Sequence, residues 1–181
     1  MSSSAGFSSN PILPSIIVAS ILVLFTALSC VLMDRAGRRP LLLASGALMG
    51  VSACALGAYY RVAGAGGYAG LSLGSVCLFV AGFSVGWGPV PWLVMGEMLP
   101  GKVRGGASGA ATLFNWGCAF VVTKEFMAVA AAVSPAATFF GFGAINIVGV
   151  VMVWLLLPET KGRSLDEIER IFDGRETTTG D

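Results

Sequence analysis

Two prolines, only two residues apart, interrupt an otherwise uncharged run of the chain, in the segment Gly86-Trp87-Gly88-Pro89-Val90-Pro91-Trp92. Each proline lacks a backbone N–H, so Pro89 and Pro91 each release a backbone carbonyl if the segment is helical. Inside a membrane such carbonyls need protein, water or a ligand as partner. Trp87 and Trp92 add flat faces with an N–H donor, which suit stacking on a sugar ring. Interrupted helices of this kind mark the substrate site of many transporters, but a kink that only shapes packing explains the spacing equally well.

A second polar and aromatic pair, Asn115-Trp116, lies within another uncharged run. An asparagine amide carries two donors and an acceptor, which match the hydroxyl groups of a neutral polyol. A hydrogen bond between two helices is the alternative, and periodicity alone slightly favours it. The sequence therefore indicates two candidate substrate-lining segments without separating binding from packing.

Opposite charges gather near the ends of three different apolar runs. Charges in such places can form a network that closes one face of a bundle and breaks when that face opens, as alternating access requires. The alternative is a set of solvated loop charges whose pairs contribute about 0–1 kcal/mol each. The residues concerned are Asp34, Arg35, Arg38 and Arg39, then Glu97 and Arg104, and finally Glu159, Lys161 and Arg163.

The residues that soluble-type catalysis or metal binding needs are largely missing. The chain has no histidine, and its four cysteines, Cys30, Cys54, Cys77 and Cys118, have neither metal-ligand spacing nor loop positions suited to disulfides. No phosphate-binding loop is present in the sequence, and no carboxylate falls within an apolar run. We therefore expect no cofactor, no metal, no enzyme activity and no nucleic-acid partner.

Long uncharged stretches must hold these residues in place. Only 11 basic and 10 acidic residues occur among 181, and the mean hydropathy is +0.81. A helix needs roughly 20 apolar residues to cross about 30 Å of hydrocarbon, and core helices of soluble proteins keep a polar face that these stretches lack. The sequence therefore predicts an all-α, polytopic membrane protein with five transmembrane helices, at 12–33, 40–60, 69–96, 105–123 and 133–157.

The two ends of the chain are more polar than these spans. Residues 1–11 are rich in Ser, Asn and Pro, and we expect an external loop or a frayed end there. Residues 158–181 contain a capping box, Ser164 and Glu167, ahead of apolar residues at helical spacing. That pattern predicts a short amphipathic helix on the cytoplasmic face, followed by a tail.

The basic residues predict the orientation. All Lys and Arg except Arg61 and Lys124 fall on one side of the predicted spans, and the positive-inside rule places that side in the cytoplasm. The carboxy terminus is then cytoplasmic and the amino terminus external. Because an external start and an odd number of spans are awkward for a whole protein, we expect that earlier spans precede this segment.

Five motifs, in matching order and at matching separations, make the chain similar to the sugar-porter branch of the major facilitator superfamily. The likeness is greatest to the facilitative hexose transporters. The motifs are Asp34-Arg35-Ala36-Gly37-Arg38-Arg39, the Gly86–Trp92 run leading to Glu97, Arg104-Gly105, Asn115-Trp116, and Pro158-Glu159-Thr160-Lys161-Gly162-Arg163. The resemblance covers residues 12–173, and it implies that the five spans correspond to helices eight to twelve of a twelve-helix transporter.

The resemblance also implies roles for particular residues. Those implied to bind or line the substrate are Gly88, Trp92 and Asn115, with Trp116 as a neighbouring wall. Those implied to form a cytoplasmic gate network are Asp34, Arg38, Arg39, Glu97, Arg104, Glu159 and Arg163.

Two short segments make the chain resemble the intracellular-vesicle type of hexose transporter within this family: Gly-Trp-Gly-Pro at 86–89 and Thr-Lys-Glu-Phe at 123–126. Ser84 departs from better-known glucose transporters, which carry Glu there. The implied function is facilitative transport of a hexose such as glucose by alternating access, in the plasma membrane or in endosomal or lysosomal vesicles. The implied partners are the hexose, the lipid bilayer and a missing amino-terminal half. The alternative is a half-transporter that binds or regulates a full-length relative without transporting.

Overall fold

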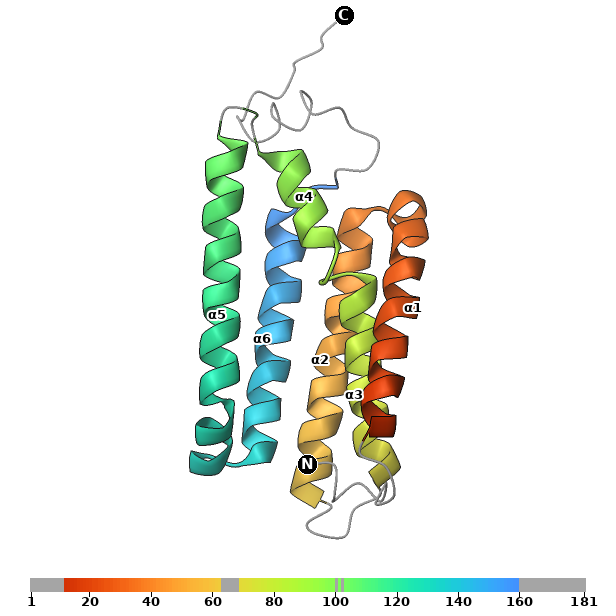
Figure 1. Ribbon diagram of the computed structural model, residues 1–181, viewed down its shortest axis with the longest axis vertical. Coiled ribbons are helices and arrows are strands. Elements are labelled where there is room, and N and C mark those ends of the chain that lie inside the picture. Colours follow the sequence, from red (N-terminus) through yellow and green to blue (C-terminus); the bar gives the residue numbers. More distant parts are fainter. Residues whose placement is uncertain (1–11, 63–68, 100, 102, 160–181) are drawn as a thin grey trace, which may run out of the picture.

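The computed structural model describes residues 12–62, 69–99, 101 and 103–159, and these form a bundle of helices without a strand (Figure 1). Five stretches are long and apolar enough to cross a membrane: Ile12–Ala36, Arg38–Val62, Gly70–Met98, Arg104–Ala132 and Pro135–Leu156. The predicted fold class, all-α with five long apolar helices, is thereby confirmed. The amphipathic helix expected after Pro158 and the loop expected at 1–11 lie outside the described residues.

The third of these stretches is broken, so that six helices are seen. They are α1 (Ile12–Ala36), α2 (Arg38–Val62), α3 (Ala69–Val85), α4 (Val90–Met98), α5 (Arg104–Ala132) and α6 (Pro135–Leu156). Gly86–Pro89 form a turn between α3 and α4. In Figure 1, α4 lies above the end of α3 and leans toward α6.

Local sequence accounts for several helix boundaries. Gly37 separates α1 from α2 and has a φ of +91°, a conformation that residues with a Cβ rarely adopt. Ser134 begins α6 because its Oγ accepts a hydrogen bond from the Ala137 N–H at 3.1 Å. Pro135 follows at the first helical position, where its missing N–H costs nothing.

The centre of the bundle lies along α2, which carries more buried residues than any other described helix. Small residues let α6 approach it closely. A Cβ built on Gly57 would lie 3.2 Å from the Phe140 ring of α6, and one built on Gly143 would lie 2.6 Å from the Cys54 sulfur of α2. The interface between α2 and α6 is therefore set by glycines on both helices.

Helix α5 stands apart from this centre. It is drawn at one side of the bundle in Figure 1, and none of its residues is buried. Its contacts with the other helices are few and involve α6 and α4. Most of the α5 surface away from its contacts with α6 and α4 is accordingly exposed.

Candidate functional site

The break between α3 and α4 keeps most of its backbone hydrogen bonds by widening one turn. The Gly88 N–H donates to the Phe83 carbonyl, five residues back, at 2.7 Å, and the Val90 N–H returns to the usual spacing with the Gly86 carbonyl at 3.0 Å. This geometry follows from the prolines, because Pro89 and Pro91 have no N–H to continue the α-helical ladder. The interruption expected in this segment is present.

Gly86 brings the break into direct contact with α2. A Cβ built on it would overlap the Ser45 side chain and lie 2.9 Å from the Leu41 carbonyl oxygen. One of these two neighbours is backbone, which cannot rotate away as a side chain can. Only a residue without a Cβ fits here, so the position of the break relative to α2 is tightly defined.

Trp87 anchors the same break from within the bundle. Its Nε1 donates to the Leu42 carbonyl of α2 at 3.0 Å. Its ring lies between two glycines, since a Cβ built on Gly46 of α2 would come within 2.6 Å of Nε1 and one on Gly149 of α6 within 3.1 Å of the ring edge. With its N–H and much of its ring engaged, the packing alternative explains Trp87 better than stacking on a sugar does.

We expect that Trp87→Phe lowers the free energy of unfolding by about 1–3 kcal/mol, because the Leu42 carbonyl then loses the indole donor at a partly buried site. The measurement is denaturant unfolding of the chain in detergent micelles. Trp154→Phe is the matched control, because the Trp154 side chain is largely exposed, and we expect it to change the unfolding free energy little. Equal effects of the two substitutions would contradict the anchoring role.

The residues expected to contact substrate lie on α4, on α5 and in the break. Trp92 extends from α4 with 43% of its surface exposed, and Trp116 extends from α5 with 66% exposed. Asn115 is also exposed, and no hydrogen bond from its amide occurs among the described residues. Gly88 is half-buried, and a Cβ built on it would lie 3.2 Å from the Phe83 ring. Trp92 and Asn115 thus keep exposed surface on this bundle.

Two apolar cavities adjoin these helices. One of about 710 Å³ lies between α2, α4 and α6 and is lined by Trp87, Pro91, Met95 and Met152 among others. The other, of about 340 Å³, is lined by four phenylalanines, three aliphatic residues, and Ser52 and Ser75, whose hydroxyls already donate to their own helices. A sugar buries hydroxyl groups that need hydrogen-bond partners, so neither cavity suits it.

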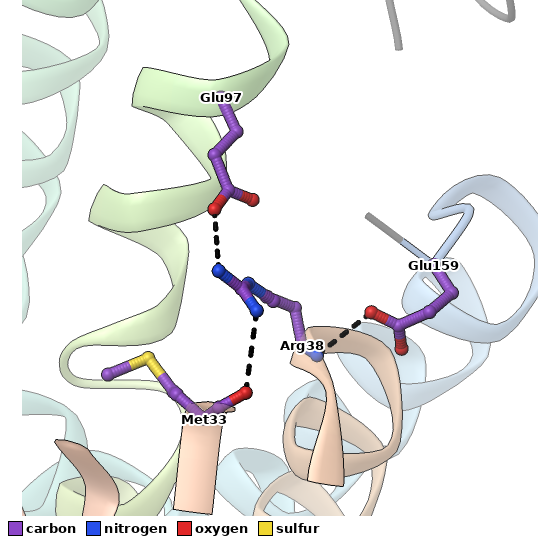
Figure 2. Close-up of polar contacts among 4 residues, drawn as sticks. All are labelled: Met33, Arg38, Glu97 and Glu159. Carbon is purple, nitrogen blue, oxygen red and sulfur yellow. Dashed lines mark hydrogen bonds and ion pairs between the residues drawn. The ribbon is translucent and has the colours of Figure 1, made fainter. Parts of the chain in front are cut away.

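At the other end of α4, a charged cluster joins three helices (Figure 2). Arg38, the first residue of α2, places Nη2 at 2.8 Å from Oε1 of Glu97 on α4. Its Nη1 donates to the Met33 carbonyl of α1 at 3.4 Å. Both charged side chains are mostly buried, so this pair is less weakened by solvent than a surface pair is.

Glu159, beyond the end of α6, takes part in a different way. Its carboxylate oxygens accept hydrogen bonds from the backbone N–H groups of Arg38 and Arg39, at 3.0 and 3.1 Å. These amides open α2 and lack partners within that helix, so the carboxylate both caps α2 and neutralises the positive end of its dipole. Sequence reasoning places Glu159 in a charge network but misses this cap, because the carboxylate lies 120 residues from the amides that it binds.

The remaining expected gate residues are less closely joined. Arg39 donates through Nη2 to the Trp154 carbonyl of α6 at 2.6 Å, and Arg104 donates through Nε to the nearby Leu99 carbonyl at 3.1 Å. Asp34 is exposed at the end of α1. Arg163 lies outside the described residues. The structure thus brings Arg38, Arg39, Glu97 and Glu159 together and leaves Arg104 bonded locally.

Comparison with known families extends these observations. The sequence model of the family described as "Sugar (and other) transporter" matches residues 1–172. The chain belongs to this family. Among sugar transporters, the facilitated trehalose transporter Tret1 of Culex quinquefasciatus is 43% identical over 94% of this chain. Solute carrier family 2, facilitated glucose transporter member 8, of Bos taurus is 42% identical over 90% of it.

Solved structures of sugar transporters share the fold. The inward-open xylose transporter XylE of E. coli superposes with a TM-score of 0.80 and 28% identity, covering 93% of this chain and 39% of that one. A double-tryptophan mutant of XylE gives a TM-score of 0.81 over 89% of this chain and 34% of that one. The chain likewise spans 34% of the Culex relative and 39% of the Bos taurus relative. The helices described above are therefore part of a major facilitator fold.

Proposed function

We propose that this chain contributes the carboxy-terminal helices of a transporter that moves a hexose such as glucose through a membrane by alternating access. The observation that carries the proposal is the interrupted helix α3–α4, which bears Trp92 after its break and Glu97 near its far end. A helix broken in mid-membrane can change its angle at the break, and substrate sites gather at such breaks. Two of the matched relatives are a facilitated trehalose and a facilitated glucose transporter, which supports facilitative transport of a sugar.

The charged cluster can act as a latch for such a movement, that is, a set of polar contacts that holds α4 against α2 until α4 moves. Glu97 on α4 is held by Arg38 at the start of α2, and Glu159 holds the start of α2 to the end of α6. A change in the angle of α4 would pull Glu97 away from Arg38 and release that face. We place this face in the cytoplasm, on the distribution of basic residues, in the plasma membrane or an endosomal or lysosomal one.

The sugar would bind where Trp92 and Asn115 are exposed, between this bundle and an amino-terminal half. No bond of the sugar is made or broken in this mechanism, so the proposed function involves no enzymatic step. The largely exposed α5 also fits the alternative of a half-transporter that binds a full-length relative without transporting, since such a partner needs an exposed helix surface.

Uptake by a chimera tests the proposal. Residues 12–159 replace the corresponding segment of the Bos taurus glucose transporter, and uptake of labelled glucose into proteoliposomes is measured. We expect uptake by the chimera, and at least a tenfold loss in Trp92→Ala and in Asn115→Ala, since each removes a contact worth about 1–3 kcal/mol.

Trp154→Ala is the control for this experiment, because it removes another exposed tryptophan, on α6, that is not among the expected sugar contacts. We expect it to keep most of the uptake. Competition by unlabelled trehalose shows whether a disaccharide is accepted. A chimera that reaches the membrane folded but takes up no sugar would contradict the transport function. Co-purification of the unmodified chain with a longer relative would then favour the half-transporter.

A further inference from the structure

Ser29, in the last third of α1, makes an unusual hydrogen bond. Its side chain is completely buried, with 0% of the residue exposed. The hydroxyl donates to the main-chain carbonyl of Val85, the last residue of α3, at 2.6 Å. Other helical serines behave differently: Ser52 and Ser84 donate to carbonyls four residues back in their own helices. Ser29 instead joins two helices at the point where one of them breaks.

The acceptor of this bond is the carbonyl that Pro89 leaves without its usual donor. In an α-helix the carbonyl of residue 85 accepts from the N–H of residue 89, and proline has none. The next bond in the ladder, from the Val90 N–H to the Gly86 carbonyl, has the normal four-residue spacing. A non-proline residue at 89 would therefore present its N–H to the same oxygen that Ser29 occupies.

We propose that Ser29 is a positioning residue that replaces the donor missing at Pro89 and thereby fixes the angle between α3 and α4. The break is then held from two sides, by the Ser29 hydroxyl of α1 and by the bond from Trp87 to α2. Helix α4 leaves this support carrying Trp92 and Glu97. The effect of Ser29 on transport rests on the proposed function. The hydrogen bond from Ser29 to Val85 does not depend on that function.

A hydroxyl serves this purpose better than a backbone amide would. An amide is fixed to its own helix, whereas the Ser29 hydroxyl can rotate to the carbonyl four residues back, that of Phe25, as helical serines commonly do. Ser29 thus has one acceptor on α3 and a second on α1. The contact between α1 and the break can open without leaving the hydroxyl unbonded, which makes it a reversible support for a moving helix.

A double-mutant cycle between Ser29 and Pro89 tests the inference. The unfolding midpoint of the full chain in detergent micelles is measured for Ser29→Ala, Pro89→Ala and the double variant. We expect Ser29→Ala alone to lower the midpoint by about 4 °C, because the partly buried Val85 carbonyl loses its donor. In the Pro89→Ala background the loss should fall to less than half, since the new N–H at position 89 reaches that carbonyl.

Ser52→Ala is the matched control, because Ser52 is also fully buried but donates within α2, away from the break. Its effect should be the same whether Pro89 is kept or replaced by alanine. An equal effect of Ser29→Ala in both backgrounds would show that Ser29 only fills space, and would overturn the proposal.

The chimera described above separates this inference from the proposed function. Ser29 does not contact the expected sugar site, so Ser29→Ala should change the maximal uptake rate at least threefold and leave the half-saturating glucose concentration within twofold. If the cycle in the full chain shows coupling but the chimera never transports, the proposed function is refuted and the support role is kept. If the chimera transports but the cycle shows no coupling, the support role is refuted and the proposed function is kept.

Discussion

Replacing Gly86 with alanine is expected to lower the free energy of unfolding by about 3 kcal/mol or more, or to prevent folding. The new methyl group would overlap the Ser45 side chain and lie 2.9 Å from the Leu41 carbonyl oxygen. Moving the break aside to relieve this overlap would cost the hydrogen bonds from Trp87 and Ser29 that hold it on either side. Denaturant unfolding in detergent micelles, with helix content followed by circular dichroism, measures the loss.

Gly74→Ala is the control for this prediction. Gly74 lies on α3, and a Cβ built there has no neighbour within 4 Å. Alanine has the higher helix propensity, so the variant should be as stable as the parent or slightly more so. The double variant Ser45→Gly/Gly86→Ala should recover only part of the loss, because the Leu41 carbonyl remains. Equal stability of Gly74→Ala and Gly86→Ala would show that the approach of the break to α2 is not tight.

Replacing Glu159 with alanine is expected to cost about 3 kcal/mol of folding free energy. The carboxylate accepts two hydrogen bonds from the N–H groups of Arg38 and Arg39, and bonds to a charged acceptor are worth about 1.5–3 kcal/mol each. Glu159→Gln keeps one acceptor oxygen without the charge, so we expect roughly half the loss. The measurement is the same unfolding experiment, with helix content resolving whether the start of α2 frays.

An exposed acidic residue provides the comparison for Glu159. Glu125 pairs with Lys124 at 3.7 Å on the open surface of α5, where an ion pair contributes little. Glu125→Gln should leave the unfolding midpoint unchanged. If Glu159→Ala also left the unfolding midpoint unchanged, the cap on α2 would not be formed in the folded chain. The latch proposed at this end would then lose its support.

Several features of the fold can be predicted from the sequence because they depend on neighbouring residues. Uncharged runs of sufficient length predict five long apolar helices, which the structure confirms. The break after Val85 follows from Pro89 and Pro91, which remove donors wherever the chain lies. Arg38 and Glu97 stand at the ends of apolar runs, and the structure joins them by an ion pair.

The partners of individual polar groups could not be predicted in the same way. Trp87 has the flat face and N–H of a sugar-binding residue, but which carbonyl its indole meets depends on how α2 and α6 pack around it. Ser29 carries no signal in its own neighbourhood, because its acceptor lies 56 residues away. Arg104 has the expected charge, but it bonds to Leu99 within its own turn. Long-range packing decides the partners of Trp87 and Ser29, whereas Arg104 takes a nearby carbonyl that its charge alone does not indicate.

The interface between α2 and α6 also bears on how the chain is made. Helix α2 ends at Val62 and α6 begins at Pro135. At roughly 5–20 residues per second, a ribosome needs roughly 4–14 s to synthesise the chain between them. During that interval the glycine-lined face of α2 has left the ribosome without its final neighbour. We expect lipid or the membrane-insertion machinery to cover this face in the meantime, so substitutions there that leave the finished protein stable can still reduce its yield.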